Sequence, residues 1–375
     1  MKFYKYFIFS LAFIPGTALS GETSYTINGG TDLLYGYSDV STRYERLDKN
    51  NNYVGNVHVN AAVEHDFNEE YSGGIYIDLM AGSGMEIQNY TFGSWGKEIY
   101  GVLNTPYGQI TGGETLNAAA QLQPDIPAYG PLRINNSAIV DFISNPNWYR
   151  RNRKYSSFKT LNSTAMNTDG SAAKISYYTP QIAHTILGFS YIPDTYSRTG
   201  LVSNYADYSR KDAYVAALYH EADLGFIETA ISLGYGIYHK TDKDFTAAIA
   251  AYRGNWSAGA SYRKTYVDGN TYHLKADNRN PRTPQWFDNY REGQAWSTGI
   301  GYRFGPYKAS LSYFKSEADN TRNKDEIIML ANDFQVNKHL NIYAIAAHVN
   351  FKGEDRDIHD NNKGYAFVTG IGINF

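Results

Sequence analysis

The sequence of 375 residues has no cysteine, no surplus of positive charge and, beyond the N-terminus, no long apolar segment. Without cysteine, the chain can have neither a disulfide framework nor a thiolate metal site. The formal net charge of −3 argues against a nucleic-acid-binding protein, because such proteins are usually basic. Since no later stretch has 18 consecutive apolar residues, we do not expect an α-helical membrane protein.

Tyrosine and glycine are abundant instead. The chain has 35 tyrosines and 34 glycines, and aromatic residues make up 15% of it, yet its mean hydropathy is −0.48. A polar chain with so many tyrosines and glycines fits a sheet that has one wet face, one apolar face and aromatic borders.

The N-terminus has the features of a secretory signal peptide. Lys2 and Lys5 form a basic region, residues 7–14 are apolar, and residues 18–20 (Ala-Leu-Ser) offer small side chains for cleavage. The apolar stretch is too short for a membrane anchor. We therefore expect residues 1–20 to be removed and residues 21–375 to form one domain.

The rest of the chain alternates with a period of two, which is typical of β-strands. Between Ile227 and Ile237, every second residue is large and mostly apolar, and the intervening residues are mostly small. Two windows, 243–253 and 323–335, have less distinct faces. In all, the pattern predicts sixteen strands: 23–37, 53–65, 71–80, 97–104, 108–113, 171–179, 182–192, 211–222, 225–238, 243–253, 255–268, 292–304, 306–316, 323–335, 338–350 and 363–375.

Short and long connections follow one another along these strands, with two exceptions at 239–242 and 317–322. A transmembrane barrel with short periplasmic turns and longer extracellular loops has this rhythm. Strands in lipid must close into a barrel because open sheet edges would leave amides unpaired. About sixteen strands enclose more space than side chains alone can fill. The sequence therefore predicts an all-β fold, a transmembrane antiparallel β-barrel of about sixteen strands.

Residues 114–170 form the one very long loop, the third long connection. Structureless loops beyond about 15 residues are usually functional or disordered. This loop is rich in apolar side chains, so we expect it to fold into the barrel and narrow the pore. Opposed charges there would select solutes by charge. Arg150 to Lys154 could equally be a solvated face of the loop.

The candidate pore residues fall into two groups. In the loop they are Glu114, Asp125, Asp141, Arg133, Arg150, Arg151, Arg153 and Lys154, accompanied by Asp169 and Lys159. On the inner wall of the barrel they are Asp78, Lys174, Arg263, Arg303 and Lys308.

Several segments resemble Gram-negative general porins. Tyr100-Gly-Val-Leu and Tyr107-Gly-Gln-Ile-Thr-Gly-Gly-Glu114 resemble the strand pair before the constriction loop. Lys174-Ile-Ser-Tyr-Tyr-Thr-Pro180 and Gly188-Phe-Ser-Tyr191 resemble the pair after it in alphaproteobacterial porins. The terminal Phe375 resembles the assembly signal of outer-membrane barrels. The resemblance implies a homotrimer with an inward-folded third loop. Gly113 departs from the family, which often has arginine there.

Other classes of function find less support. The Ser-x-x-Lys pattern occurs four times, but three of these matches lie in predicted strands, where residues three apart point to opposite faces and cannot pair directly. No His-Glu-x-x-His motif is present, so we expect no catalytic site, no metal and no cofactor. The leading hypothesis is a porin for ions and small hydrophilic solutes, surrounded by outer-membrane lipid and lipopolysaccharide. A plugged barrel serving as adhesin, receptor or anchor is the alternative.

Overall fold

The structure is a computed structural model, and it describes residues 21–41, 51–82, 96–132, 134, 138–148, 150–151, 155–156, 160–195, 211–238, 242–267, 292–319, 321–353 and 361–375. The expected signal peptide and the loop residues Arg133, Arg153, Lys154 and Lys159 lie outside these ranges, and so do the side chains of Arg150 and Arg151.

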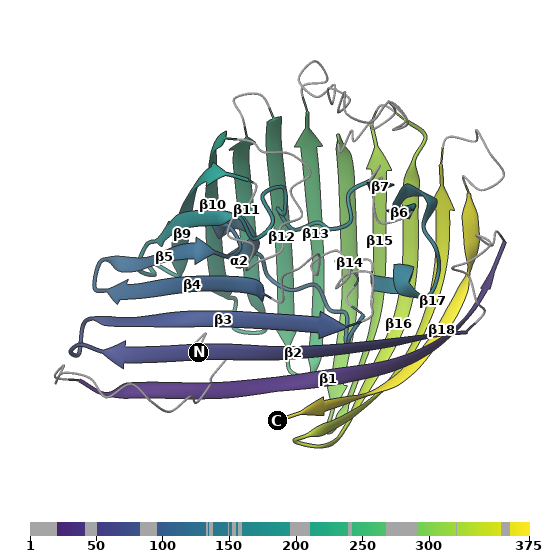
Figure 1. Cartoon of the computed structure of the whole chain (residues 1–375), viewed down its shortest axis with the longest axis horizontal. Helices are drawn as coiled ribbons and strands as arrows, with labels where there is room; N and C mark the ends of the chain where they lie inside the picture. The colour runs from purple at the N-terminus through teal and green to yellow at the C-terminus, as the bar shows by residue number, and fades with distance from the viewer. Residues whose placement is uncertain are drawn as a thin grey trace, which may run out of the picture.

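Sixteen antiparallel strands form one closed barrel (Figure 1). Each strand pairs with its neighbours in sequence, and β1 closes the ring by pairing with both β2 and β18. The strands are β1 (Thr23–Val40), β2 (Asn51–Asp66), β3 (Ser72–Gly82), β4 (Gly96–Thr105), β5 (Gly108–Glu114), β8 (Ala173–Tyr178), β9 (Thr185–Asp194), β10 (Lys211–Asp223), β11 (Glu228–Tyr238), β12 (Asp242–Arg253), β13 (Trp256–Tyr266), β14 (Gly293–Phe304), β15 (Tyr307–Ala318), β16 (Lys324–Asn337), β17 (Leu340–Lys352) and β18 (Asn362–Asn374).

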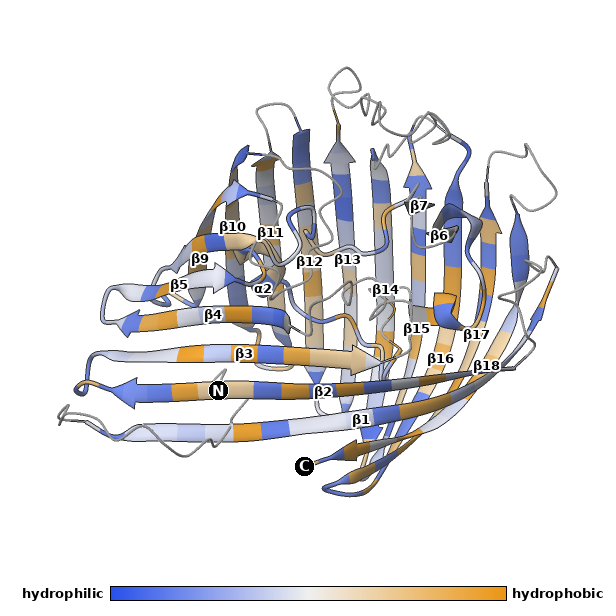
Figure 2. Ribbon diagram, in the orientation of Figure 1, coloured by the Kyte–Doolittle hydropathy of each residue, from blue (hydrophilic) through white to orange (hydrophobic). Residues whose placement is uncertain are grey.

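The alternation of the sequence sets which face of each strand points outward. In β14, Trp296 and Ile300 are about half exposed on the outer surface, whereas Ala295 and Ser297, on either side of Trp296, are buried. Figure 2 shows this change of hydropathy from residue to residue along the strands. All sixteen predicted strands are confirmed, each with its ends shifted by only a few residues.

Aromatic side chains gather near both ends of the outer surface. Trp256 and Tyr302, with ring centroids 4.5 Å apart, lie near the short turns. Tyr262 and Trp296, 4.2 Å apart, lie nearer the long connections. Rings that are apolar but carry a polar atom favour the boundary between hydrocarbon and water. The two groups therefore mark the edges of the band that faces lipid.

The connection between β5 and β8 runs inside the barrel (Figure 1). It contains α2 (Ala118–Gln121), η2 (Ala138–Asp141), η3 (Pro146–Trp148) and the small antiparallel pair β6 (Arg150–Arg151) and β7 (Tyr155–Ser156). Among the described residues, no helix combines the length and hydropathy needed to cross a membrane.

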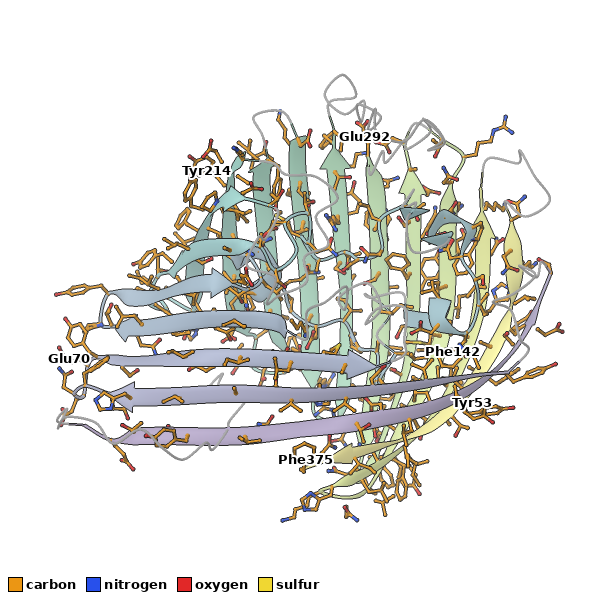
Figure 3. All side chains as sticks on the ribbon, viewed as in Figure 1. Tyr53, Glu70, Phe142, Tyr214, Glu292 and Phe375 are labelled. Atoms are coloured by element: carbon orange, nitrogen blue, oxygen red, sulfur yellow. The ribbon has the colours of Figure 1, made fainter. Side chains whose placement is uncertain are left out.

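Two apolar clusters attach this loop to the inner wall. One joins Phe142, labelled in Figure 3, and its loop neighbours to inward-facing residues of β16–β18 such as Met329 and Val349. The other joins α2 and Met166 to inward-facing residues of β8–β11, among them Ile192 and Val215. The predicted inward fold of the third loop is therefore confirmed, and a hydrophobic core lies within the barrel.

Candidate functional site

A buried ion pair anchors the C-terminal end of the loop. Lys174, in β8, lies 3.1 Å from the carboxylate of Asp169, and both side chains are fully buried. Asp169 also accepts hydrogen bonds from the amide of Asn117, at 2.6 Å, and the hydroxyl of Tyr238, at 3.0 Å. The Lys174 ammonium also donates to the backbone oxygen of Thr115. The two ends of the loop are thus fixed at one point.

A second buried ion pair holds the loop to the neighbouring part of the wall. Arg263, in β13, donates from Nε and Nη2 to the carboxylate of Asp244, in β12, at 3.0 and 2.7 Å. The same guanidinium donates to Asn167 and, at 2.8 Å, to Thr168. Thr168 in turn donates to Asp244 at 2.7 Å. Burial of such a charge requires a complete set of partners.

A third polar group anchors the middle of the loop. Asp325, in β16, is buried and accepts hydrogen bonds from Asn147, at 2.9 Å, and from Thr160. The Asn147 amide also donates to the backbone oxygen of Lys352 at 2.8 Å. The loop therefore reaches across the lumen from β8 to β17.

Glycines on the wall allow the loop backbone to come close. A Cβ at Gly299 would lie 2.3 Å from the backbone oxygen of Pro127. That oxygen accepts a hydrogen bond from Ser312 at 2.7 Å, and the amide of Tyr129 donates to Ser310 at 2.8 Å. Along β14 and β15 the loop thus contacts the wall through its backbone.

The inner face of β2–β4 keeps partial exposure at Tyr76, Asp78 and Tyr100. The rings of Tyr76 and Tyr100 stack with centroids 5.2 Å apart, and Tyr76 donates to Glu64 at 2.6 Å. Asp78 lies opposite the buried Glu98 across the strand pair. This face is tyrosine-rich and acidic.

The candidate pore residues have different environments in the structure. Asp78 pairs with Lys97 at 3.2 Å, and Lys308 pairs with Asp333 at 3.1 Å. Arg303 is exposed and lies 5.5 Å from the ring centroid of Tyr129. Asp125 is also exposed. These four wall and loop groups are the described candidates with access to solvent inside the barrel.

Lys174 and Arg263 require a correction. Both point inward, as alternation predicts, but the loop covers them, so neither side chain contacts water in the pore. Glu114 is also buried, at 5% exposure. Asp141 lies in η2, partly buried, and its backbone oxygen accepts a hydrogen bond from Asn52.

The backbone explains the glycine that departs from the porin pattern. Gly113 has φ of +141°, and a Cβ there would lie 2.4 Å from the backbone oxygen of Ile99. An arginine would be strained in this conformation. The sequence analysis did not single out Asp244 or Asp325. The alternation of the two strands nevertheless places both on the inner face, because Phe245 and Ile328 lie on the outer face.

Comparisons with known proteins agree with this architecture. A sequence model of the Gram-negative porin family matches residues 8–354. An uncharacterized protein of Rickettsia bellii is 27% identical over 269 residues, and the match spans 57% of this chain and 57% of that protein. The sequence similarity to this relative thus covers little more than half of its length.

Solved structures of outer-membrane proteins share the fold. The anion-selective porin from Comamonas acidovorans has a TM-score of 0.58 at 13% identity, covering 94% of this chain and 100% of that one. In-vitro folded OmpT of Vibrio cholerae, in a trimer form, has 0.56 at 11% identity, covering 94% and 99%. An engineered Rhodopseudomonas blastica porin has 0.53 at 12%, covering 94% and 100%. From the match over most of its length, the chain belongs to the Gram-negative porin family.

Proposed function

We propose that the chain forms a water-filled channel for passive diffusion of ions and small hydrophilic solutes across the bacterial outer membrane. Barrels of sixteen strands leave an aqueous lumen. The observation that carries the proposal is the partly exposed inner face of β2–β4, beside a loop whose described anchors lie mainly on β8–β18. We infer that solutes pass along this face without any catalytic step.

The charges along this path favour cations. Glu64 and Asp78 are partly exposed on the inner face, the buried Glu98 lies opposite Asp78, and Lys97 pairs with Asp78. Arg303 and Lys308 lie on the opposite part of the wall. The proposal also includes the other basic loop residues as residues that line the pore, namely Arg133, Arg150, Arg151, Arg153 and Lys154.

The channel is proposed to work as a homotrimer. The support is the family resemblance, together with the trimer form recorded for OmpT of Vibrio cholerae. Export by the signal peptide of residues 1–20 and assembly through Phe375 belong to the same proposal. Two backbone hydrogen bonds between Gly29 and Phe375, of 3.0 and 3.2 Å, join the C-terminus to β1.

Single-channel recording tests the function. The mature protein, refolded and added to a planar bilayer under a salt gradient, should give stepwise conductance, in threes for a trimer. The reversal potential should show a preference for cations. A barrel that inserts but stays electrically silent would refute the channel and favour a plugged receptor or anchor.

A further inference from the structure

The inner face of β1 has a gap where the loop approaches it. Gly36 lies on this face between Leu34 and Ser38, which are 2% and 5% exposed. A Cβ on Gly36 would lie 2.1 Å from Cδ1 of Phe142 and 2.6 Å from its Cε1. Non-bonded carbon atoms pack at about 3.5–4.0 Å, so no side chain fits at this position while the ring is in place. The ring of Phe142 occupies the space that such a side chain would need.

The neighbouring strand holds the residue that precedes this ring. Asn52, in β2, is the register partner of Gly36. Its side-chain amide donates to the backbone oxygen of Asp141. The backbone amide of Phe142 donates to the backbone oxygen of Ile139 at 2.9 Å, so a short helical turn presents the ring to the wall. One cross-strand pair of the wall thus receives two consecutive residues of the loop.

This contact is one of two edges of the loop that border the inner face of β2–β4. At the other edge, where the loop begins, the hydroxyl of Thr115 donates to Glu98, in β4, at 2.5 Å. In the order of the strands, β2 and β3 lie between the two edges. Tyr76 and Asp78, in β3, keep partial exposure there. The contact at Gly36 is therefore the boundary between the part of the wall that the loop covers and the part that stays accessible.

The packing around the ring leaves little room for small adjustments. Phe142 is 5% exposed and belongs to the cluster that contains Leu34, in β1, and Val54, in β2. Close-packed side chains respond to an added atom group by moving as a unit, because the interior has few voids. A side chain at Gly36 would therefore displace the ring from the wall, together with the backbone on both sides of it.

We propose that Gly36 and Phe142 are positioning residues that fix the width of the passage beside β2–β4. This rests on the proposed function, because it requires solutes to pass along that face. The gap at Gly36 lets the loop lie against the wall, and a larger side chain there pushes residues 141–143 toward the passage and narrows it. The effect is steric, so it acts on uncharged solutes as well as on ions, in contrast to the effect of the Asp78 carboxylate.

Polymer exclusion and amide exchange together test this role. Single-channel conductance is recorded with polyethylene glycols of graded size, and G36V should shift the cut-off to smaller polymers. Hydrogen exchange of the amides of residues 138–144 should become about 5- to 150-fold faster in G36V, an effect of the order that overpacking a core produces. G36V/F142A should return both quantities toward the wild-type values, because the valine then has the space that the ring has left.

G30V is the matched control. Gly30 lies on the same face of β1, but the atoms nearest to its Cβ belong to His58, Ile373 and Asn374 of the wall and not to the loop. This variant should leave the polymer cut-off and the exchange of residues 138–144 unchanged.

The outcomes separate the two proposals. Wild-type exchange in G36V would overturn the contact, and so would a defect that G36V/F142A fails to reduce. Faster exchange with an unchanged polymer cut-off would overturn the role in setting the width. A wild-type barrel that carries no current would contradict the proposed channel, whereas the exchange data would still decide whether Gly36 receives the ring of Phe142.

Discussion

Replacing Arg263 with methionine should release the loop from the wall without unfolding the barrel. The substitution removes four hydrogen bonds, two to Asp244 and one each to Asn167 and Thr168. It also leaves the Asp244 carboxylate, 1% exposed, with Thr168 as its described hydrogen-bond donor. Breaking one side of a buried ion pair costs about 3–5 kcal/mol. The equilibrium between docked and released loop should therefore shift by about two to four orders of magnitude.

Limited proteolysis measures this shift. Cleavage by trypsin within residues 115–172 follows the population of the released loop when the loop closes faster than it is cut. R263M should be cleaved much faster than the wild-type protein, and its single-channel current should be larger and noisier. The double variant R263M/D244L should return close to wild-type rates, because replacing both members of a buried pair with apolar residues is often neutral. If R263M is cleaved at the wild-type rate, or the double variant as fast as R263M, the ion pair does not hold the loop.

Three further outcomes are expected. G299A should lower the free energy of unfolding of the refolded barrel in urea by about 1–3 kcal/mol, because its Cβ would collide with the backbone of Pro127. The control G112A should change the stability much less, because no atom lies within 4 Å of its Cβ. Equal effects of the two variants would contradict a close contact between loop and wall. D78N should move the reversal potential toward zero, and an unchanged potential would remove Asp78 from the path of the ions. F375A should lower the assembled fraction in cells while refolding in vitro is unaffected, and normal assembly would refute the proposed signal.

The strands were predictable because lipid outside and water inside impose opposite preferences on alternate residues. In β11, Ile231 and Leu233 face outward and alternate with small inward residues, so the pattern is plain. The window 323–335 was ambiguous for a physical reason. In β16 the inward residues Ile327 and Met329 are as apolar as the outward Ile328 and Leu330, because the loop packs on that side.

The site was less predictable than the fold, because alternation gives the direction of a side chain and not what covers it. Lys174 and Arg263 were correctly placed on the inner face and were expected to line the pore, yet the loop buries both. Their partners, Asp169 and Asp244, are 5 and 19 residues away. Asp169 reaches Lys174 through the fold of the loop, and Asp244 reaches Arg263 through the register of β12 and β13. Gly113 shows the same limit, since its backbone conformation is a property of the turn into the loop.

The apolar wall beneath the loop also means that a shortened loop would not give a wider pore of the same kind. Phe314, Met329 and Val349 would then face the channel, where water wets apolar surfaces poorly and exposed apolar patches promote association. Loop and wall therefore form one unit in which a change of shape on one side demands a matching change on the other. Related chains should accordingly vary in pairs across this contact, a large loop side chain with a small wall side chain and the reverse.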